Sequence, residues 1–426
     1  MGTVNQTKLP TASDERVGVL DFYGDMTPKT RKAFWACSAG FALDAMDFMM
    51  FPLLIGTLIA LWGMDGATAG GIATISLWSS AVGGWLGGFL SDRVGRVRTM
   101  QITVLLFSVG SLLSGFAQSP EQLAIYRALL GIGFGGEAAV AAVTLSEAVS
   151  AKYRGRVMGF YASSYAVGWA IAVLAQLLTF YLFEPEIAWR VMFFIGALPA
   201  ILIFYIRRHV EEPAIAARAK REQGRPSLMG IFTNGNLRST ILGSLLSIGA
   251  QGGFYSLMIW MPQFLRAERN ISVIGSTPYL LVVIFGAFLG YVTGGWLSDR
   301  MGRRFVFIGS SILAASLAYV YTHIPQLSDN IMLLIGFPLG FVASSYYSAV
   351  LPCLNELFPT SVRGSGVGFT YNAGRAVGGL FPFLVGAFTA TMPLSSAICL
   401  FALISYGLLL VTALFIGETN GTELRA

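Results

Sequence analysis

The sequence predicts an all-α membrane protein in which twelve transmembrane helices form two pseudo-symmetric bundles of six. Three observations lead to this fold class: an apolar composition, twelve apolar segments of spanning length, and an internal repeat. Of the 426 residues, 55% are hydrophobic and only 12% are charged, whereas soluble proteins are about 25% charged. A soluble domain could not cover so much apolar surface with so few charges.

The apolar segments follow one another along the chain with short connections. A helix needs about 20 apolar residues to cross a bilayer, and a helix start is expected at Asp25-Met26-Thr27-Pro28, before the first span, since proline favours the first helical turn. The twelve segments are 33–61, 69–90, 99–118, 121–147, 157–182, 189–207, 238–264, 274–296, 304–322, 331–355, 365–390 and 394–416. The expected domains are a tail (1–32), a bundle (33–207), a loop (208–237), a second bundle (238–416) and a tail (417–426).

Basic residues set the orientation of such a chain, because cytoplasmic loops are enriched in Lys and Arg. With the N-terminus inside, the inner loops and the 208–237 connection hold most of the cations, while the outer loops hold little beyond Arg190, Arg266 and Arg269. Both termini are therefore expected in the cytoplasm, with the chain in a bacterial inner membrane. The basic residues of the cytoplasmic loops then account for the net charge of +6, and we expect no nucleic-acid partner.

The two halves repeat each other. The motif G-x-L-S-D-R-x-G-R stands at 88–96 and again at 295–303, and the Arg-Gly pair at 154–155 returns at 363–364. Gly159-Phe160 likewise returns as Gly368-Phe369. The repeats in register predict two homologous halves.

These paired motifs resemble the signature of the major facilitator superfamily, in which two bundles rock about a central site that faces one side of the membrane at a time. The acids of the motif can cap helix N-termini and meet basic residues, and the Glu and Arg-Gly segments resemble those of sugar porters. A gate at the cytoplasmic ends is therefore expected, rather than substrate contact. Its candidate residues are Asp92, Arg93, Arg96, Glu147, Arg154, Asp299, Arg300, Arg303, Glu356 and Arg363.

The stretch Gly131-x-Gly133-x-x-Gly136 has the spacing of a dinucleotide-binding loop. That reading requires a strand before the glycines and an exposed loop for the pyrophosphate. Here they lie inside the fourth apolar segment, where small residues let helices approach closely. We expect no nucleotide and no other cofactor.

Charged residues inside the spans are costly and invite a functional interpretation. Asp44 and Asp47 share a face of the first span, and Arg127 in the fourth span lies at a similar depth, about 20 Å from the cytoplasmic side at 1.5 Å per residue. We expect proton coupling by these residues and Glu137, with a static pair as the alternative. The stretch 43–48 resembles the D-G-x-D segment of aromatic-acid and sialic-acid proton symporters, with Ala45 in place of glycine.

Arg375 lies near the middle of the eleventh span, without an acid at comparable depth in its own half. A guanidinium binds a carboxylate in bidentate fashion, so a substrate carboxylate is the expected partner, with Asp44, Asp47 or Glu137 as the alternative. Polar and aromatic residues on neighbouring spans could complete a pocket for a ring with polar edges. The remaining candidate binding residues are Asn372, Tyr371, Gln251, Tyr255, Tyr165, Tyr346 and Ser345.

The function expected from this resemblance is proton-coupled symport that imports a small organic anion, an aromatic or cyclic carboxylate, by a monomer in the lipid bilayer. The alternatives are a sugar or polyol symporter and, third, a multidrug exporter. Two histidines and three scattered cysteines supply no metal site or nucleophile set, so neither a metal nor an enzymatic activity is expected. The short tails also argue against a transporter-like sensor.

Overall fold

The computed structural model describes residues 20–94, 96–147, 153–197, 228–233, 235–323, 329–359 and 362–420, and within them it is helical without any β-strand. Seven helical stretches of this part are long and apolar enough to cross a bilayer. The helices of the first half are α1 (Asp21–Asp25), α2 (Pro28–Trp62), α3 (Gly66–Val94), α4 (Arg96–Ser114), α5 (Pro120–Glu147), α6 (Arg154–Leu182) and α7 (Pro185–Ala197).

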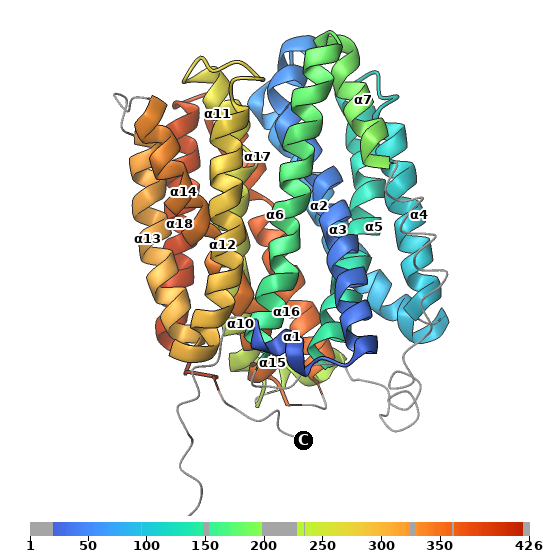
Figure 1. Ribbon diagram of the computed structural model, residues 1–426, viewed down its shortest axis with the longest axis vertical. Helices are drawn as coiled ribbons and strands as arrows, with labels where there is room; N and C mark the ends of the chain where they lie inside the picture. The colour runs from blue at the N-terminus through green and yellow to red at the C-terminus, as the bar shows by residue number, and fades with distance from the viewer. Residues whose placement is uncertain are drawn as a thin grey trace, which may run out of the picture.

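The second half begins with a short 3₁₀ helix, η2 (Leu228–Phe232), within the connection expected at 208–237. Its helices are α10 (Leu237–Met258), α11 (Met261–Ala267), α12 (Thr277–Met301), α13 (Arg303–His323), α14 (Asp329–Ser345), α15 (Tyr347–Leu357), α16 (Arg363–Gly378), α17 (Phe381–Phe388) and α18 (Leu394–Phe415). The two halves lie side by side, with α6 and α12 adjacent at their junction (Figure 1).

The first long helix begins where the sequence predicts. The Thr27 hydroxyl accepts a hydrogen bond from the Thr30 amide at 3.2 Å, and Pro28 occupies the first turn. Both features satisfy the unpaired amides of a helix start. The helix ends at Gly63, whose φ of 62° is a left-handed conformation that glycine adopts without strain.

The N-terminal tail expected at 1–32 contains a short helix that the sequence did not indicate. In α1, Phe22 is buried and packs against Phe34 of α2 and Phe160 of α6, with ring centroids 6.1 and 5.1 Å apart. Burial of this apolar ring favours the packing of α1 against α2 and α6. This end of the molecule, which also carries residues 416–420, is called the α1 end below (bottom of Figure 1).

Three spans of the second half are each broken into two helices. The predicted span 238–264 divides into α10 and α11, the span 331–355 into α14 and α15, and the span 365–390 into α16 and α17. Pro262 and Pro382 stand in the first turns of α11 and α17, and proline ends a preceding helix because it lacks an amide proton. The short helix α11 lies at the opposite end of the molecule, called the α11 end (Figure 1).

Candidate functional site

A cavity of about 130 Å³ lies between the two halves. Helices α2, α5 and α6 of the first half and α10, α12, α15 and α16 of the second contribute to its wall. The lining residues are Phe41, Phe48, Phe134, Gly135, Met158, Tyr161, Ala162, Tyr165, Phe254, Tyr255, Tyr291, Tyr347, Leu351, Pro352, Asn355, Val367, Tyr371, Asn372 and Arg375.

Aromatic rings dominate this wall and fix one another. Phe48 stacks on Phe134 with centroids 5.0 Å apart, and Phe41 stacks on Tyr161 at 4.7 Å. Tyr165 meets Phe254 edge-on at 5.9 Å across the junction of the halves. Such contacts hold the rings in place, so the cavity presents apolar faces together with several phenol hydroxyls.

Arg375 is the one cation among the described residues of the cavity wall. Its side chain is buried, and its guanidinium carbon lies over the rings of Phe134 at 5.1 Å and Tyr371 at 5.4 Å. The Tyr255 hydroxyl lies within hydrogen-bonding reach of the guanidinium. The two rings and the phenol stabilise the cation without neutralising it, which leaves a positive charge facing the cavity.

Gln251 is not part of the cavity wall, but it forms hydrogen bonds with two tyrosines of the wall. Its Nε2 donates to the Tyr371 carbonyl at 2.8 Å, and its Oε1 accepts from the Tyr255 hydroxyl at 3.1 Å. Five of the eight residues expected to bind substrate line the cavity: Tyr165, Tyr255, Tyr371, Asn372 and Arg375. The other three, Gln251, Tyr346 and Ser345, do not.

Tyr346 and Ser345 make contacts inside the second half instead. The Tyr346 hydroxyl donates to the Ala250 carbonyl at 2.9 Å, and the Ser345 hydroxyl lies 2.7 Å from that of Ser310. It is the next residue, Tyr347, that reaches the cavity. Helix α14 ends and α15 begins at this point, so the direction of each tyrosine depends on a break that the apolar pattern does not reveal.

The buried charges of the first half form a site of their own, beside the cavity rather than in its wall. Asp47 accepts a hydrogen bond at 2.8 Å from Ser111, whose hydroxyl also lies 3.1 Å from the Phe193 carbonyl. Arg127 interacts electrostatically with Asp47, donates to the Phe48 carbonyl at 3.4 Å and lies over the ring of Phe51 at 5.5 Å. The expected neighbourhood of Asp47 and Arg127 is thus present inside the first bundle.

Asp44 connects differently. It is buried, and its charge acts on the Tyr161 hydroxyl, on which Arg375 also acts. Because Tyr161 lines the cavity, the charge of Asp44 acts on a group of the cavity wall. Six further candidates have side chains outside the described part of the chain: Glu137, Asp92, Arg93, Arg96, Glu147 and Arg154.

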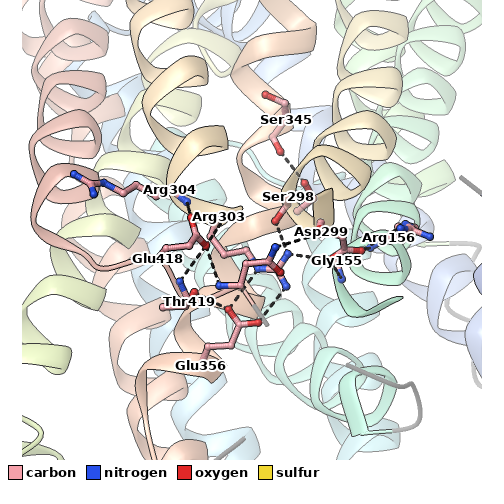
Figure 2. A network of polar contacts seen from close by, with 12 residues as sticks. Gly155, Arg156, Ser298, Asp299, Arg303, Arg304, Ser345, Glu356, Glu418 and Thr419 are labelled. Carbon is pink, nitrogen blue, oxygen red and sulfur yellow. Dashed lines mark hydrogen bonds and ion pairs between the residues drawn. The ribbon is translucent and has the colours of Figure 1, made fainter. Parts of the chain in front are cut away.

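At the α1 end, Asp299 joins the two halves (Figure 2). Its carboxylate, near the end of α12, accepts hydrogen bonds from the amides of Gly155 at 3.1 Å and Arg156 at 3.0 Å. These amides belong to the first turn of α6, where unpaired donors and the helix dipole favour an anion. Arg303 at 2.8 Å and Arg156 at 3.7 Å add ion pairs. The repeated motif therefore caps a helix of the other bundle.

Arg303 extends this network to the end of the chain. It pairs with Glu356 at 3.1 Å, and Glu356 accepts from the Thr419 hydroxyl at 2.7 Å. Glu418 accepts from the amides of Arg303 at 2.9 Å and Arg304 at 3.2 Å, at the start of α13. The sequence prediction missed Glu418 and Thr419; the signal that was available is an acid directly after the last span.

The remaining gate candidates lie close to the network. The Arg300 guanidinium lies over the ring of Trp296 at 5.2 Å. Arg363 donates to the carbonyls of Asn355 at 3.1 Å and Phe358 at 3.3 Å, which holds the start of α16 against the end of α15.

At the α11 end, the short helices of the second half touch the first half. Arg266 of α11 donates to the Thr57 hydroxyl of α2 at 3.1 Å, and the Phe383 amide of α17 donates to the Thr74 hydroxyl of α3 at 3.2 Å. The Trp260 indole donates to the Pro382 carbonyl at 3.0 Å. The halves therefore contact each other at both ends, with the cavity between.

The chain is similar to known transporters over most of its length. The chain is 37% identical over 401 residues to a probable 4-methylmuconolactone transporter of Cupriavidus pinatubonensis, covering 94% of this chain and 93% of the relative. It is 31% identical to a putative niacin/nicotinamide transporter of Bacillus subtilis, covering 92% and 98%. The structure of the proton:xylose symporter XylE superposes with a TM-score of 0.71 at 19% identity, covering 93% of this chain and 97% of XylE.

The family model of the Major Facilitator Superfamily matches residues 37–382 and 280–424, which together span nearly all of the described helices. Its fold has twelve membrane-spanning helices in two six-helix bundles, the architecture that the repeat predicted. The chain belongs to the Major Facilitator Superfamily and is a membrane transporter.

Proposed function

We propose that the protein is a proton-coupled symporter that imports a small organic anion, an aromatic or cyclic carboxylate, by alternating access. The observation that carries this proposal is Arg375, a buried cation in the wall of a small cavity lined by aromatic rings. A guanidinium in a low-dielectric site binds a carboxylate strongly, while the rings suit a flat apolar body.

The size of the cavity supports a small substrate. Its volume of about 130 Å³ is below the roughly 300–1,000 Å³ of pockets for drug-sized ligands. Two relatives are named for transport of 4-methylmuconolactone and of niacin or nicotinamide, which are small ring compounds. A neutral sugar or polyol is the alternative that the neutral sugars of the uptake experiment test, and export of many different drugs is the third candidate.

The proton-coupling residues of this proposal are Asp44, Asp47, Arg127 and Glu137. Asp47 is buried beside Arg127 and Ser111, where taking up a proton removes a buried charge. Asp44 acts on Tyr161 in the cavity wall. Protonation from outside and anion binding at Arg375 would together leave few net charges in the centre, which allows the two halves to close around the substrate.

Alternating access would use the contacts at the two ends. The Asp299 network, with the other gate candidates, would hold the α1 end closed, and α11 with α17 would do so at the α11 end. The moving bodies would be the bundles 33–207 and 238–416, joined by the 208–237 loop. We propose that the α1 end and both tails face the cytoplasm of a bacterium, because cytoplasmic loops are enriched in basic residues. The arginines at this end include Arg300, Arg303 and Arg304. We also expect a monomer.

Uptake into proteoliposomes tests the substrate class. Purified protein would be reconstituted and supplied with labelled benzoate, nicotinate, a sugar acid, a short monocarboxylate and neutral sugars. Uptake of one ring-containing acid is expected, and Arg375→Gln should lower its apparent affinity roughly 10- to 150-fold, since hydrogen bonds to a charged group contribute about 1.5–3 kcal/mol. Arg238→Gln, at an exposed arginine of α10, is the matched control. Uptake of sugars alone would overturn the anion proposal.

Proton coupling is tested with a pH-sensitive dye inside the same liposomes. Adding the transported acid should acidify the lumen in a protein-dependent manner, with empty liposomes as the control for passive leakage of the acid. Asp47→Asn should abolish this signal while substrate exchange between loaded liposomes persists. Acidification by the variant at the wild-type rate would exclude Asp47 from the coupling mechanism.

A further inference from the structure

Three buried polar atoms in the cavity wall have no hydrogen-bond partner among the residues that the structure describes: Arg375 Nε, Asn372 Oδ1 and the Tyr161 hydroxyl. The residues are 5%, 3% and 4% exposed. A buried polar atom without a partner costs about 1–3 kcal/mol, and native proteins hold few of them. These three belong to residues of one cavity wall, where a bound ligand would supply the missing partners.

The three atoms differ in what they require. Arg375 Nε can only donate, and it meets the carboxylate of the proposed function. The Tyr161 hydroxyl can donate or accept, so it tolerates either kind of group. Asn372 Oδ1 can only accept, so it discriminates between substrates that offer a donor and substrates that do not.

The orientation of the Asn372 amide is fixed by its neighbours. Its Nδ2 donates to the Gly368 carbonyl at 2.9 Å, and a carbonyl cannot partner the amide oxygen. The amide also packs closely against Gly84 of α3, where an added Cβ would lie 2.9 Å from Oδ1. Asn372 therefore cannot turn its amide nitrogen to the position of Oδ1 without losing a hydrogen bond.

We propose that Asn372 is a specificity-determining residue that accepts a hydrogen bond from a hydroxyl on the substrate. This rests on the proposed function and narrows its substrate class to ring carboxylates that carry a hydrogen-bond donor. Arg375 and Asn372 are three residues apart on α16, so their Cβ atoms lie about 5–6 Å apart on one face. A substrate hydroxyl ortho to the carboxylate would form an internal hydrogen bond with that carboxylate. We therefore expect the hydroxyl that Asn372 binds at the meta or para position of the ring.

Competition in proteoliposomes tests the assignment. Benzoate, 3- and 4-fluorobenzoate, and 3- and 4-hydroxybenzoate would be compared as inhibitors of labelled substrate uptake by the wild-type protein. At least one hydroxybenzoate should bind about tenfold more tightly than benzoate and the matching fluorobenzoate, because a site built for a hydroxyl rejects analogues without one. In Asn372→Leu the ratio should fall to about one, with benzoate still bound.

The matched control is Asn355→Leu. Asn355 also lines the cavity and also donates its Nδ2 to a carbonyl four residues earlier, that of Leu351 at 2.8 Å. This variant should keep the hydroxybenzoate-to-benzoate ratio whatever it does to overall uptake.

The outcomes separate the two proposals. Equal affinity of the wild type for benzoate, fluorobenzoate and hydroxybenzoate overturns the role of Asn372 and leaves the anion transporter intact. A preference that survives Asn372→Leu does the same. Failure of every acid to inhibit or enter refutes the proposed function itself. If Asn372→Leu does not bind benzoate, Asn372→Ala takes its place in the same comparison, and a hydroxybenzoate preference that survives in it overturns the role of Asn372.

Discussion

The two copies of the Arg-Gly segment have the same sequence pattern and different surroundings. Gly155 and Gly159 open α6, and Gly364 and Gly368 occupy the matching positions of α16. An added Cβ on Gly159 would lie 2.6 Å from the Tyr291 carbonyl of α12, and one on Gly155 would collide with the Asp299 carboxylate. At Gly364 and Gly368, no atom of the described residues lies within 4 Å of such a Cβ.

Within the described residues, the contact is made at α6 and not at the matching positions of α16; the side chain of Asp92, the repeat partner of Asp299, lies outside the described part of the chain. Helix α6 lies tightly on α12 at the α1 end. Helix α16 meets α3 closely further along, where the Trp78 indole donates to the Ala376 carbonyl at 2.6 Å. Asp299→Ala and Gly159→Ala test this contrast at the α1 end, and Trp260→Phe tests the contact at the α11 end.

The largest effect is expected for Asp299→Ala. Removing one partner of a buried ion pair costs about 3–5 kcal/mol of unfolding free energy, and we expect the lower end, about 3 kcal/mol, because Arg303 keeps Glu356. Equilibrium unfolding in detergent would measure it. Arg300→Ala, one residue further at an exposed site, should cost less than about 0.5 kcal/mol. Equal losses in both variants would show that Asp299 does not hold α6.

A smaller effect is expected for Gly159→Ala, at about 2 kcal/mol, because a methyl group pressed against backbone atoms forces α6 away from α12. Its repeat partner Gly368→Ala should be neutral, or stabilise by up to about 1 kcal/mol through helix propensity. Thermal unfolding of the two variants beside the wild type gives the comparison. The reverse ranking would contradict the asymmetry described above.

The smallest effect is expected for Trp260→Phe, which removes the hydrogen bond that ties α11 to α17 at the α11 end. The loss should be about 1 kcal/mol, the typical value for one buried hydrogen bond. Trp35→Phe is the control, since that indole donates to the Tyr23 hydroxyl at 3.2 Å on the exposed surface. Equal losses of unfolding free energy in the two variants would show that the hydrogen bond between α11 and α17 stabilises the fold no more than an exposed one.

Much of the fold could be predicted because it depends on composition and repetition. Apolar stretches of spanning length identify membrane helices wherever they occur, and the matching motifs fixed the two halves. The breaks at Pro262 and Pro382 were missed because the chain stays apolar through them. A proline alone does not decide the matter, since Pro52 lies within the continuous helix α2.

The candidate site was predictable in its residue types and less so in its geometry. Arg375 in a membrane helix is conspicuous in any sequence. The directions of neighbouring side chains are set by packing instead: Tyr347 reaches the cavity while Tyr346 bonds to Ala250, and Asp47 bonds to Ser111 while Asp44 acts on Tyr161. Partners far apart in sequence, such as Asp299 and Gly155, carry no local signal of their pairing.

The Glu418 contact has a consequence for the order of synthesis. The amide of Arg303 at the start of α13 is capped by a carboxylate 115 positions later in the chain. Thr419 likewise completes the surroundings of Glu356. The ribosome therefore synthesises α12 to α18 before it adds the carboxylate that caps α13, and the α1 end of the second bundle takes its final form only after translation has passed Thr419.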